Sequence, residues 1–142
     1  KEDIVRLDLK LFLFREMILK EKEFRELVEA HSWADYQGKY LLLQNSKQAI
    51  IPQWAYMIIA NKLYEVGGIS FVDEPSVREK ILLHIIEHKD LSEYTDKRVL
   101  IKGCGNERLS NAPYLLLTHR LSSVVRALSF GESCSMVPLF KN

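Results

Sequence analysis

The feature of this sequence that most constrains its fold is the alternation of short apolar segments with longer segments of helical periodicity. Short apolar runs predict strands, and apolar residues that recur every three or four positions predict helices. Strands are predicted at residues 4–9, 40–44, 69–73, 98–103 and 128–130, with an extended segment at 135–140 in which Pro138 indicates a sheet edge. Helices are predicted at about 20–31, 51–68, 76–88 and 112–127.

Strands that alternate with helices form parallel sheets, because the helix carries the chain back for the next parallel strand. We therefore predict an α/β fold: one mostly parallel sheet with helices on both faces, a three-layer arrangement. The chain has 142 residues, of which 47% are hydrophobic. This length suits a single domain spanning residues 1–142.

A regularity with a spacing of 58 residues divides the chain into two similar halves. Glu29, Tyr36 and Lys39 recur as Glu87, Tyr94 and Lys97. A predicted strand follows each time, then a helix with a proline near its start, then the tripeptide ISF or LSF. Two interpretations stay open: an internal duplication, and the repetitive pattern that any α/β fold shows.

Charge and hydropathy exclude several functional classes. The formal net charge is +1, with 20 basic and 19 acidic residues interspersed along the chain. This balance argues against nucleic-acid binding, which requires a clustered basic surface. No apolar run is long enough to span a bilayer, and the start lacks a signal-peptide pattern, so we expect a cytoplasmic protein without membrane contact.

Polar side chains that directly follow the predicted strands mark the expected binding site. The carboxyl ends of parallel strands meet at one edge of a sheet, where open α/β sheets bind ligands. We predict that a small-molecule ligand binds at this edge, lined by Asn45, Ser46, Asp73, Cys104, Asn106, Glu132 and Cys134.

Cys104 is the one candidate nucleophile at this edge. It opens a loop between a strand and a helix, as in rhodanese-type sulfurtransferases and cysteine phosphatases, and Arg108 could stabilise an anion there. Glu107 opposes this interpretation, because it stands where those loops carry a glycine. The alternative is a small buried cysteine at the end of a strand.

The two cysteines of the chain, Cys104 and Cys134, each follow a predicted strand. We expect both thiols on the same edge, close enough for a reversible disulfide or a shared pocket wall. They do not form a zinc site, because structural zinc needs four ligands. The segment HIIEH, residues 84–88, matches a zinc-peptidase pattern but places both histidines on a polar helix face, so no metal and no cofactor are predicted.

The helical segment WAYMIIA, residues 54–60, is apolar on nearly all sides. Such a helix lies in a core or between subunits. The interpretation as core is favoured, and a homodimer through this helix stays open.

Four ordered stretches, ILKEKEFRE, IIPQWAYM, VLIKGC and GESCSMVPLFK, resemble an uncharacterised bacterial family, a domain of unknown function. The resemblance covers nearly the whole chain and implies a small bacterial cytoplasmic protein. It implies no reaction and no catalytic residue. The matched motif positions are Trp54, Tyr56, Gly103, Cys104, Gly131, Glu132, Cys134, Ser135 and Pro138.

Two functional hypotheses follow from the sequence, and whether the protein is an enzyme stays open. The first is a non-catalytic module that binds a small ligand or a regulatory partner, because no nucleophile, base and orienting group occur together. The alternative is a cysteine-dependent transferase of sulfur or acyl groups that uses Cys104.

Overall fold

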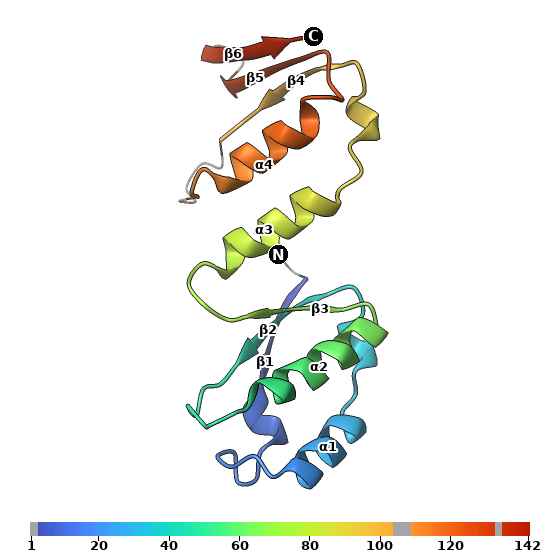
Figure 1. The fold of residues 1–142 in the computed structure, drawn as a ribbon, viewed down its shortest axis with the longest axis vertical. Helices are drawn as coiled ribbons and strands as arrows, with labels where there is room; N and C mark the ends of the chain where they lie inside the picture. Colours follow the sequence, from blue (N-terminus) through green and yellow to red (C-terminus); the bar gives the residue numbers. More distant parts are fainter. Residues whose placement is uncertain (1–2, 104–108, 133–134) are drawn as a thin grey trace. The chain divides into compact units, whose positions relative to one another are not determined.

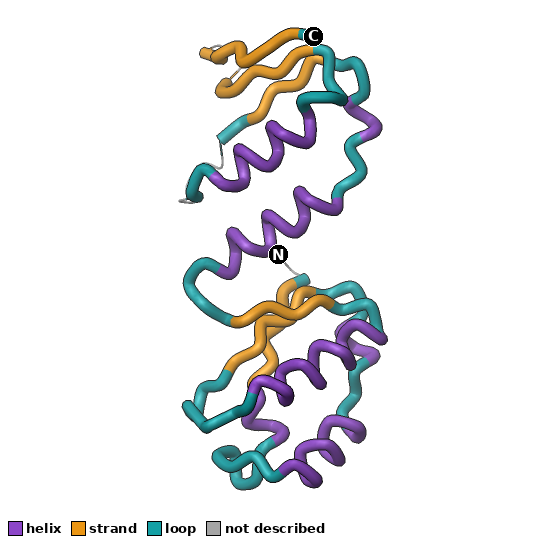
Figure 2. The backbone as a smooth tube through the Cα atoms, viewed as in Figure 1, coloured by secondary structure: helices purple, strands orange, loops and turns teal. Residues whose placement is uncertain are grey.

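A computed structural model describes residues 3–103, 109–132 and 135–142 of the chain. Helices and strands alternate along it (Figures 1 and 2). The contacts between residues group the chain into two compact units, Lys1–Val77 (unit 1) and Arg78–Asn142 (unit 2).

Unit 1 contains a parallel sheet of three strands in the order β1-β2-β3. The strands are β1 (Ile4–Asp8), β2 (Tyr40–Gln44) and β3 (Ile69–Val72). The helices are α1 (Glu21–Ala30), α2 (Gln53–Glu65) and two short 3-10 helices, η1 (Leu9–Phe12) and η2 (Ala34–Tyr36). Helix α2 begins directly after Pro52, and the glycines that follow it end the helix, as the sequence indicated.

The core of unit 1 lies between the sheet and its two longer helices. Leu41 and Leu43 of β2 contribute from the sheet, Phe24 and Val28 from α1, and α2 adds apolar side chains along one face. Burial of apolar surface therefore holds β2, α1 and α2 together. The fully buried members from α2 are Ala55, Ile59 and Leu63.

Unit 2 contains a second sheet in the order β4-β5-β6. Strands β4 (Arg98–Ile101) and β5 (Ala127–Glu132) are parallel, and β6 (Ser135–Lys141) is antiparallel to β5. Its helices are α3 (Val77–His88), η3 (Ser92–Tyr94) and α4 (Ala112–Leu121). The core is formed by the buried residues Leu91, Ile101, Leu121, Val125 and Leu128.

The α/β class predicted from the sequence is confirmed, and three of the four strand pairings are parallel. The strands differ from the expected single sheet in forming two sheets of three strands each. Periodicity identifies strands but not their pairing, because pairing depends on contacts distant in sequence. The last helix also ends at Leu121, six residues earlier than expected, and the following strand is longer than the predicted tripeptide.

The repeat with a spacing of 58 residues is present in the structure. Helices α1 and α3 end 58 residues apart, η2 and η3 span equivalent residues, and the strand pairs β2–β3 and β4–β5 share one register. Tyr40 pairs with Ile69, and Arg98 pairs with Ala127. The tripeptides ISF and LSF lie one residue out of this register, so their likeness is not part of the structural repeat. Each half is thus an α-3-10-β-α-β unit, extended by β1 in unit 1 and by β6 in unit 2.

Equivalent positions also share their backbone conformation and burial. Gly38 and Asp96 both have positive φ, 72° and 61°, at the turn before the strand. Leu63 and Leu121 are both buried at the end of the second helix. The two halves therefore share the turn conformation with different residues and the buried helix position with the same residue.

Candidate functional site

A pocket of about 410 Å³ lies in unit 2, at the carboxyl ends of β4 and β5. Helix α4 forms one wall, and the three strands form the other. This volume is within the range of small-molecule sites, roughly 300–1,000 Å³. The lining residues are Ile101, Asn111, Tyr114, Thr118, Phe130, Val137 and Leu139.

The lining is mostly apolar with a few hydrogen-bonding groups. Phe130, on β5, is 37% exposed, and its ring meets the ring of Tyr114 edge-on with centroids 5.7 Å apart. The hydroxyl of Thr118 donates to the Tyr114 carbonyl at 2.7 Å, which leaves the hydroxyl oxygen free to accept. None of the lining residues that the structure describes is charged. The pocket therefore suits an uncharged ligand.

The strand pairing explains why these side chains share a face. Phe130 lies opposite Ile101 on β4 and opposite Val137 on β6. A register shift next to Leu128 and Ser129 makes Leu139 the extra residue of β6. Such a bulge changes the direction of a strand locally and redirects side chains. The pocket thus depends on the pairing of three strands.

Gly131 of β5 lies close against the backbone of β6, opposite Met136. Its φ is +119°, and a Cβ built on it would lie 2.8 Å from the carbonyl oxygen of Ser135. A side chain at this position is excluded by both the backbone conformation and the space. Any larger residue would therefore displace β6 and the two side chains that it contributes to the pocket.

The segment between β4 and α4 is held at its far end by a carboxylate. Glu79 of α3 accepts hydrogen bonds from the Ser110 backbone N–H and from the Ser110 hydroxyl, both at 2.7 Å. The Ser110 hydroxyl oxygen accepts in turn from the Ala112 N–H at the start of α4. The backbone and side-chain hydrogen bonds from Ser110 lower the pKa of Glu79 and outweigh the opposing effect of desolvation. The start of α4 is therefore tied to α3.

Of the predicted site residues, three lie together at the carboxyl edge of the sheet in unit 1. Asn45 and Ser46 follow β2, and Asp73 follows β3. The Asp73 carboxylate accepts from Gln44 at 2.7 Å and from Arg6 at 3.2 Å. Asn45 bonds both backbone groups of Ala49 through its amide. These polar groups are engaged in holding the loops of the edge.

Asp8 belongs to the same edge and was not predicted from the sequence. Burial raises the pKa of its carboxyl, but hydrogen bonds from Ser46 and from the Lys10 backbone outweigh this effect, and the pKa is lowered. The Lys10 N–H lies 3.0 Å from the carboxylate. A strand that ends in Asp is a signal that could have added this residue to the predicted set.

The remaining predicted site residues stay a prediction. Glu132 is the last residue of β5 in the second sheet, whereas Asn45, Ser46 and Asp73 follow strands of the first, so the expectation of one common sheet edge is wrong for Glu132. The candidate nucleophile and three further predicted site residues lie outside the residues that the structure describes. These residues are Cys104, Asn106, Arg108 and Cys134.

The two histidines of the HIIEH segment form a close pair on α3. The rings of His84 and His88 lie 4.2 Å apart between centroids, and His88 bonds the His84 carbonyl at 2.9 Å. Burial and the neighbouring His88 lower the pKa of His84, and Glu87 opposes them. In the part of the chain that the structure describes, no three metal-binding side chains cluster. The zinc-peptidase interpretation thus has no third ligand among these residues.

The sequence did not identify the aromatic and aliphatic walls of the pocket. The sequence pattern predicted ordinary strand positions for Phe130, Val137 and Leu139. It predicted a helix position for Tyr114. One usable signal was the concentration of large apolar residues on two short consecutive strands that have little helix to cover them.

Across the described helices, none combines the length and apolar character needed to cross a membrane.

Comparison with known proteins identifies one matching family. A family model described as a protein of unknown function (DUF2480) matches residues 1–142. Comparisons with curated proteins and with solved structures give no match. The predicted membership of a family of unknown function is confirmed.

Proposed function

Since the chain belongs to the DUF2480 family of proteins of unknown function, we propose its function from the site: a non-catalytic module that binds a small uncharged ligand in the unit 2 pocket. The observation that supports this proposal is the pocket itself, with its apolar wall and few hydrogen-bonding groups. Pockets of this composition bind ligands by burying apolar surface, and the polar groups set the orientation.

The lining defines the chemistry of the ligand. Phe130 and Val137 offer apolar surface for a planar or branched hydrocarbon body. Asn111, at the start of α4, and Thr118, about two helical turns further on, offer an amide and a hydroxyl group on the same wall. We therefore expect an aromatic or aliphatic ligand with one or two uncharged polar groups. A carboxylate or phosphate would meet no cation among the described lining residues.

The experiment uses N-phenyl-1-naphthylamine, a neutral aromatic amine whose fluorescence rises in apolar surroundings. We expect saturable binding to the full chain and at least about tenfold weaker binding to Phe130→Ala, which loses most of one wall. Leu115→Ala is the matched control, because Leu115 lies on α4, is 61% exposed and does not line the pocket.

Two results would contradict the proposal. Equal affinity for wild type and Phe130→Ala, with both folded by circular dichroism, would place the probe elsewhere. A Cys104 thiol that reacts with iodoacetamide with a pKa well below about 8.5 would favour the cysteine-dependent transferase. An ordinary thiol is expected for the binding module.

A further inference from the structure

The outer edge of β4 is open in unit 2. Strand β4 stands first in the order β4-β5-β6, and within the described residues no strand pairs with its other side (Figure 1). Its equivalent in unit 1, β2, is paired on that same side by β1 along the whole strand. In unit 1, the position that corresponds to this open edge is therefore occupied by a parallel strand.

A groove of about 350 Å³ runs along the open edge. It is lined by Glu93, Tyr94, Lys97, Arg98, Val99 and Leu100. Of the equivalent residues of unit 1, 58 positions earlier, Tyr40, Leu41 and Leu42 pair with β1, and Tyr36 matches Tyr94. In unit 1 the groove is filled by a strand that contributes Val5 and Leu7 to the core.

The backbone of β4 presents free hydrogen-bonding groups to this groove. The carbonyl of Lys97 accepts from the N–H groups of Arg126 and Ala127 next to β5. Since neighbouring residues of a strand bond to opposite sides, the N–H and C=O groups of Arg98 and Leu100 point to the open edge. In unit 1 the equivalent Tyr40 N–H donates to the Asp3 carbonyl at 2.7 Å.

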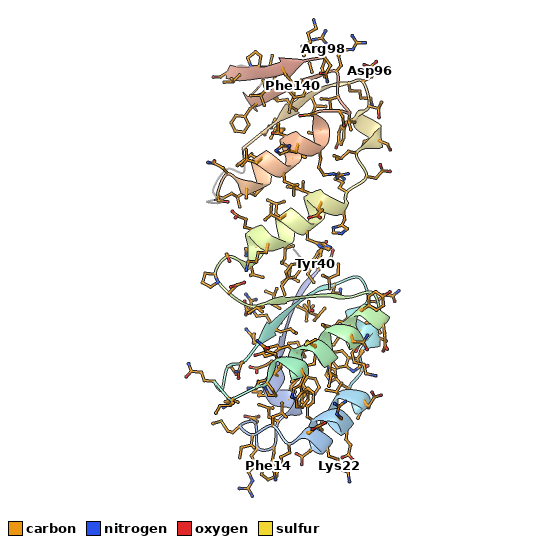
Figure 3. All side chains as sticks on the ribbon, viewed as in Figure 1. Phe14, Lys22, Tyr40, Asp96, Arg98 and Phe140 are labelled. Carbon is orange, nitrogen blue, oxygen red and sulfur yellow. The ribbon has the colours of Figure 1, made fainter. Side chains whose placement is uncertain are left out.

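We propose that the open edge of β4 binds an extended, acidic peptide segment of a partner protein as an added parallel strand. Addition of a strand to a sheet edge uses main-chain hydrogen bonds for affinity and alternate side chains for specificity. Lys97 and Arg98 in the groove and the exposed Lys102 after β4 make the edge basic, and Glu93 is the one carboxylate among the described lining residues. Asp96 is engaged by Arg126 at 3.3 Å, and Figure 3 labels Asp96 and Arg98 where the strand begins.

The register of β1 on β2 predicts the sequence pattern of the peptide. Ile4, Val5 and Leu7 lie opposite Tyr40, Leu41 and Leu43. Transferred to unit 2, the first peptide residue lies opposite Arg98, the second opposite Val99 and the fourth opposite Ile101. We therefore expect a carboxylate at the first position and apolar side chains at the second and fourth. The apolar pair would extend the core of unit 2, as Val5 and Leu7 do in unit 1.

The probe is a synthetic copy of the strand that fills the equivalent edge. It comprises residues 3–9 with Ile4→Glu, blocked at both ends and carrying a fluorophore. Binding to the full chain is followed by fluorescence anisotropy. We expect saturable binding that weakens with salt, because the carboxylate meets exposed cations. The same peptide with Ile4→Lys should bind about tenfold more weakly.

Backbone methylation of the probe tests the strand geometry directly. In unit 1 the N–H groups of Val5 and Leu7 face β2, and the N–H of Arg6 faces away. N-methylation at both the Val5 and Leu7 positions should therefore weaken binding at least about tenfold. N-methylation at the Arg6 position alone should be tolerated. Equal sensitivity to the two patterns would overturn the proposed pairing.

Two protein variants test the same edge. Leu100→Pro removes an N–H that faces the groove without removing a bond to β5, and it should weaken probe binding about tenfold. Arg98→Glu keeps the backbone and should restore binding of the Ile4→Lys peptide while weakening the Ile4→Glu peptide. Arg78→Glu, an exposed charge change on α3, is the control.

Three outcomes would overturn the proposal. The first is an absence of saturable probe binding to the folded chain. The second is unchanged affinity in both Leu100→Pro and Arg98→Glu. The third is a dimer in sedimentation equilibrium that Leu100→Pro dissociates, because the edge would then be occupied by a second copy.

Discussion

For Trp54, in the largely apolar segment of α2, the contacts decide between a position in the core and a position at a subunit interface. The side chain is half-buried, packs against the core of unit 1 and meets the ring of Phe24 edge-on, with centroids 5.8 Å apart. Arg25 lies over the same indole ring at 5.6 Å. The core interpretation favoured from the sequence is therefore correct for this residue. The exposed Met57 on the same helix leaves the homodimer a prediction.

Replacement of Trp54 by alanine should lower the free energy of unfolding by roughly 2 to 3 kcal/mol, less than the 3 to 5 kcal/mol of a fully buried aromatic residue. The reason is its partial exposure. Urea unfolding measures the change. Tyr64→Ala on the same helix, where Tyr64 is 78% exposed, should change the free energy by less than about 0.5 kcal/mol. Equal losses in the two variants would contradict the assignment of Trp54 to the core.

His31 is the residue in unit 1 with the clearest expected effect of pH. Its Nε2 lies 2.7 Å from the Tyr36 hydroxyl, and its ring contacts Phe12 and Trp33. Burial lowers the pKa of His31 below its ordinary value of 6.5, and Asp35 opposes this shift. The unfolded chain therefore takes up the proton first as the pH falls below 6.5. Stability should decrease from that pH down to the lowered pKa.

The measurement is urea unfolding at pH 7.5 and at pH 5.5. His31→Gln removes the titrating group, so its stability should depend less on pH across this interval. The same substitution at the exposed His119 is the matched control. An identical pH dependence in His31→Gln and the wild type would show that another group is responsible.

At the scale of elements, the end of α3 is held by a side chain from α4. Nη1 of Arg120 donates to the carbonyls of Ile86 and Lys89, both at 2.7 Å. The last carbonyls of a helix have no partner within it, and a cation there also stabilises the helix dipole. Lys62, 58 residues earlier, pairs with Glu29 of α1 at 2.8 Å. The repeat therefore places a cation of the second helix at the end of the first in both units.

Arg120→Met keeps the length of the side chain but removes both hydrogen bonds, and it should destabilise the protein by roughly 1 to 3 kcal/mol. The loss should be accompanied by faster amide exchange at the end of α3. The control Arg126→Met breaks an exposed ion pair with Asp96 and should cost less than about 1 kcal/mol. A smaller effect at Arg120 than at Arg126 would contradict its role at the helix end.

At the scale of the whole molecule, each of the two units has its own apolar core. Leu63 and Leu121 occupy equivalent positions of the repeat and are 0% and 2% exposed. They belong to separate clusters of buried residues. Each leucine therefore stabilises a different unit.

Leu63→Ala and Leu121→Ala should each cost about 2 to 5 kcal/mol. The losses should add within about 0.5 kcal/mol in the double variant, because the two leucines share no cluster. Amide hydrogen exchange should show loss of protection mainly in the unit that carries each substitution. Strong non-additivity would show that the two cores unfold as one.

The sequence by itself determined the elements and their repetition. Strand β2 and the starts of α2 and β3 follow from local apolar periodicity, from Pro52 and from the glycine pair after α2, all of which act within a few residues. The 58-residue spacing was visible in the identities of Glu29, Tyr36 and Lys39 with Glu87, Tyr94 and Lys97, none of which is buried. The rule that parallel strands end together also predicted one edge for Asn45, Ser46 and Asp73, which follow β2 and β3, and their part in ligand binding stays a prediction.

Only the tertiary structure decided which strands pair and what the pairing leaves open. The division into two sheets, the pocket around Phe130 and the unpaired edge of β4 depend on register and on contacts between residues far apart in sequence. Pro138 marked β6 as an edge strand, but β4 contains no such residue. Periodicity alone does not distinguish the centre of a sheet from its edge, because it reports which face is buried and not which neighbour supplies the hydrogen bonds.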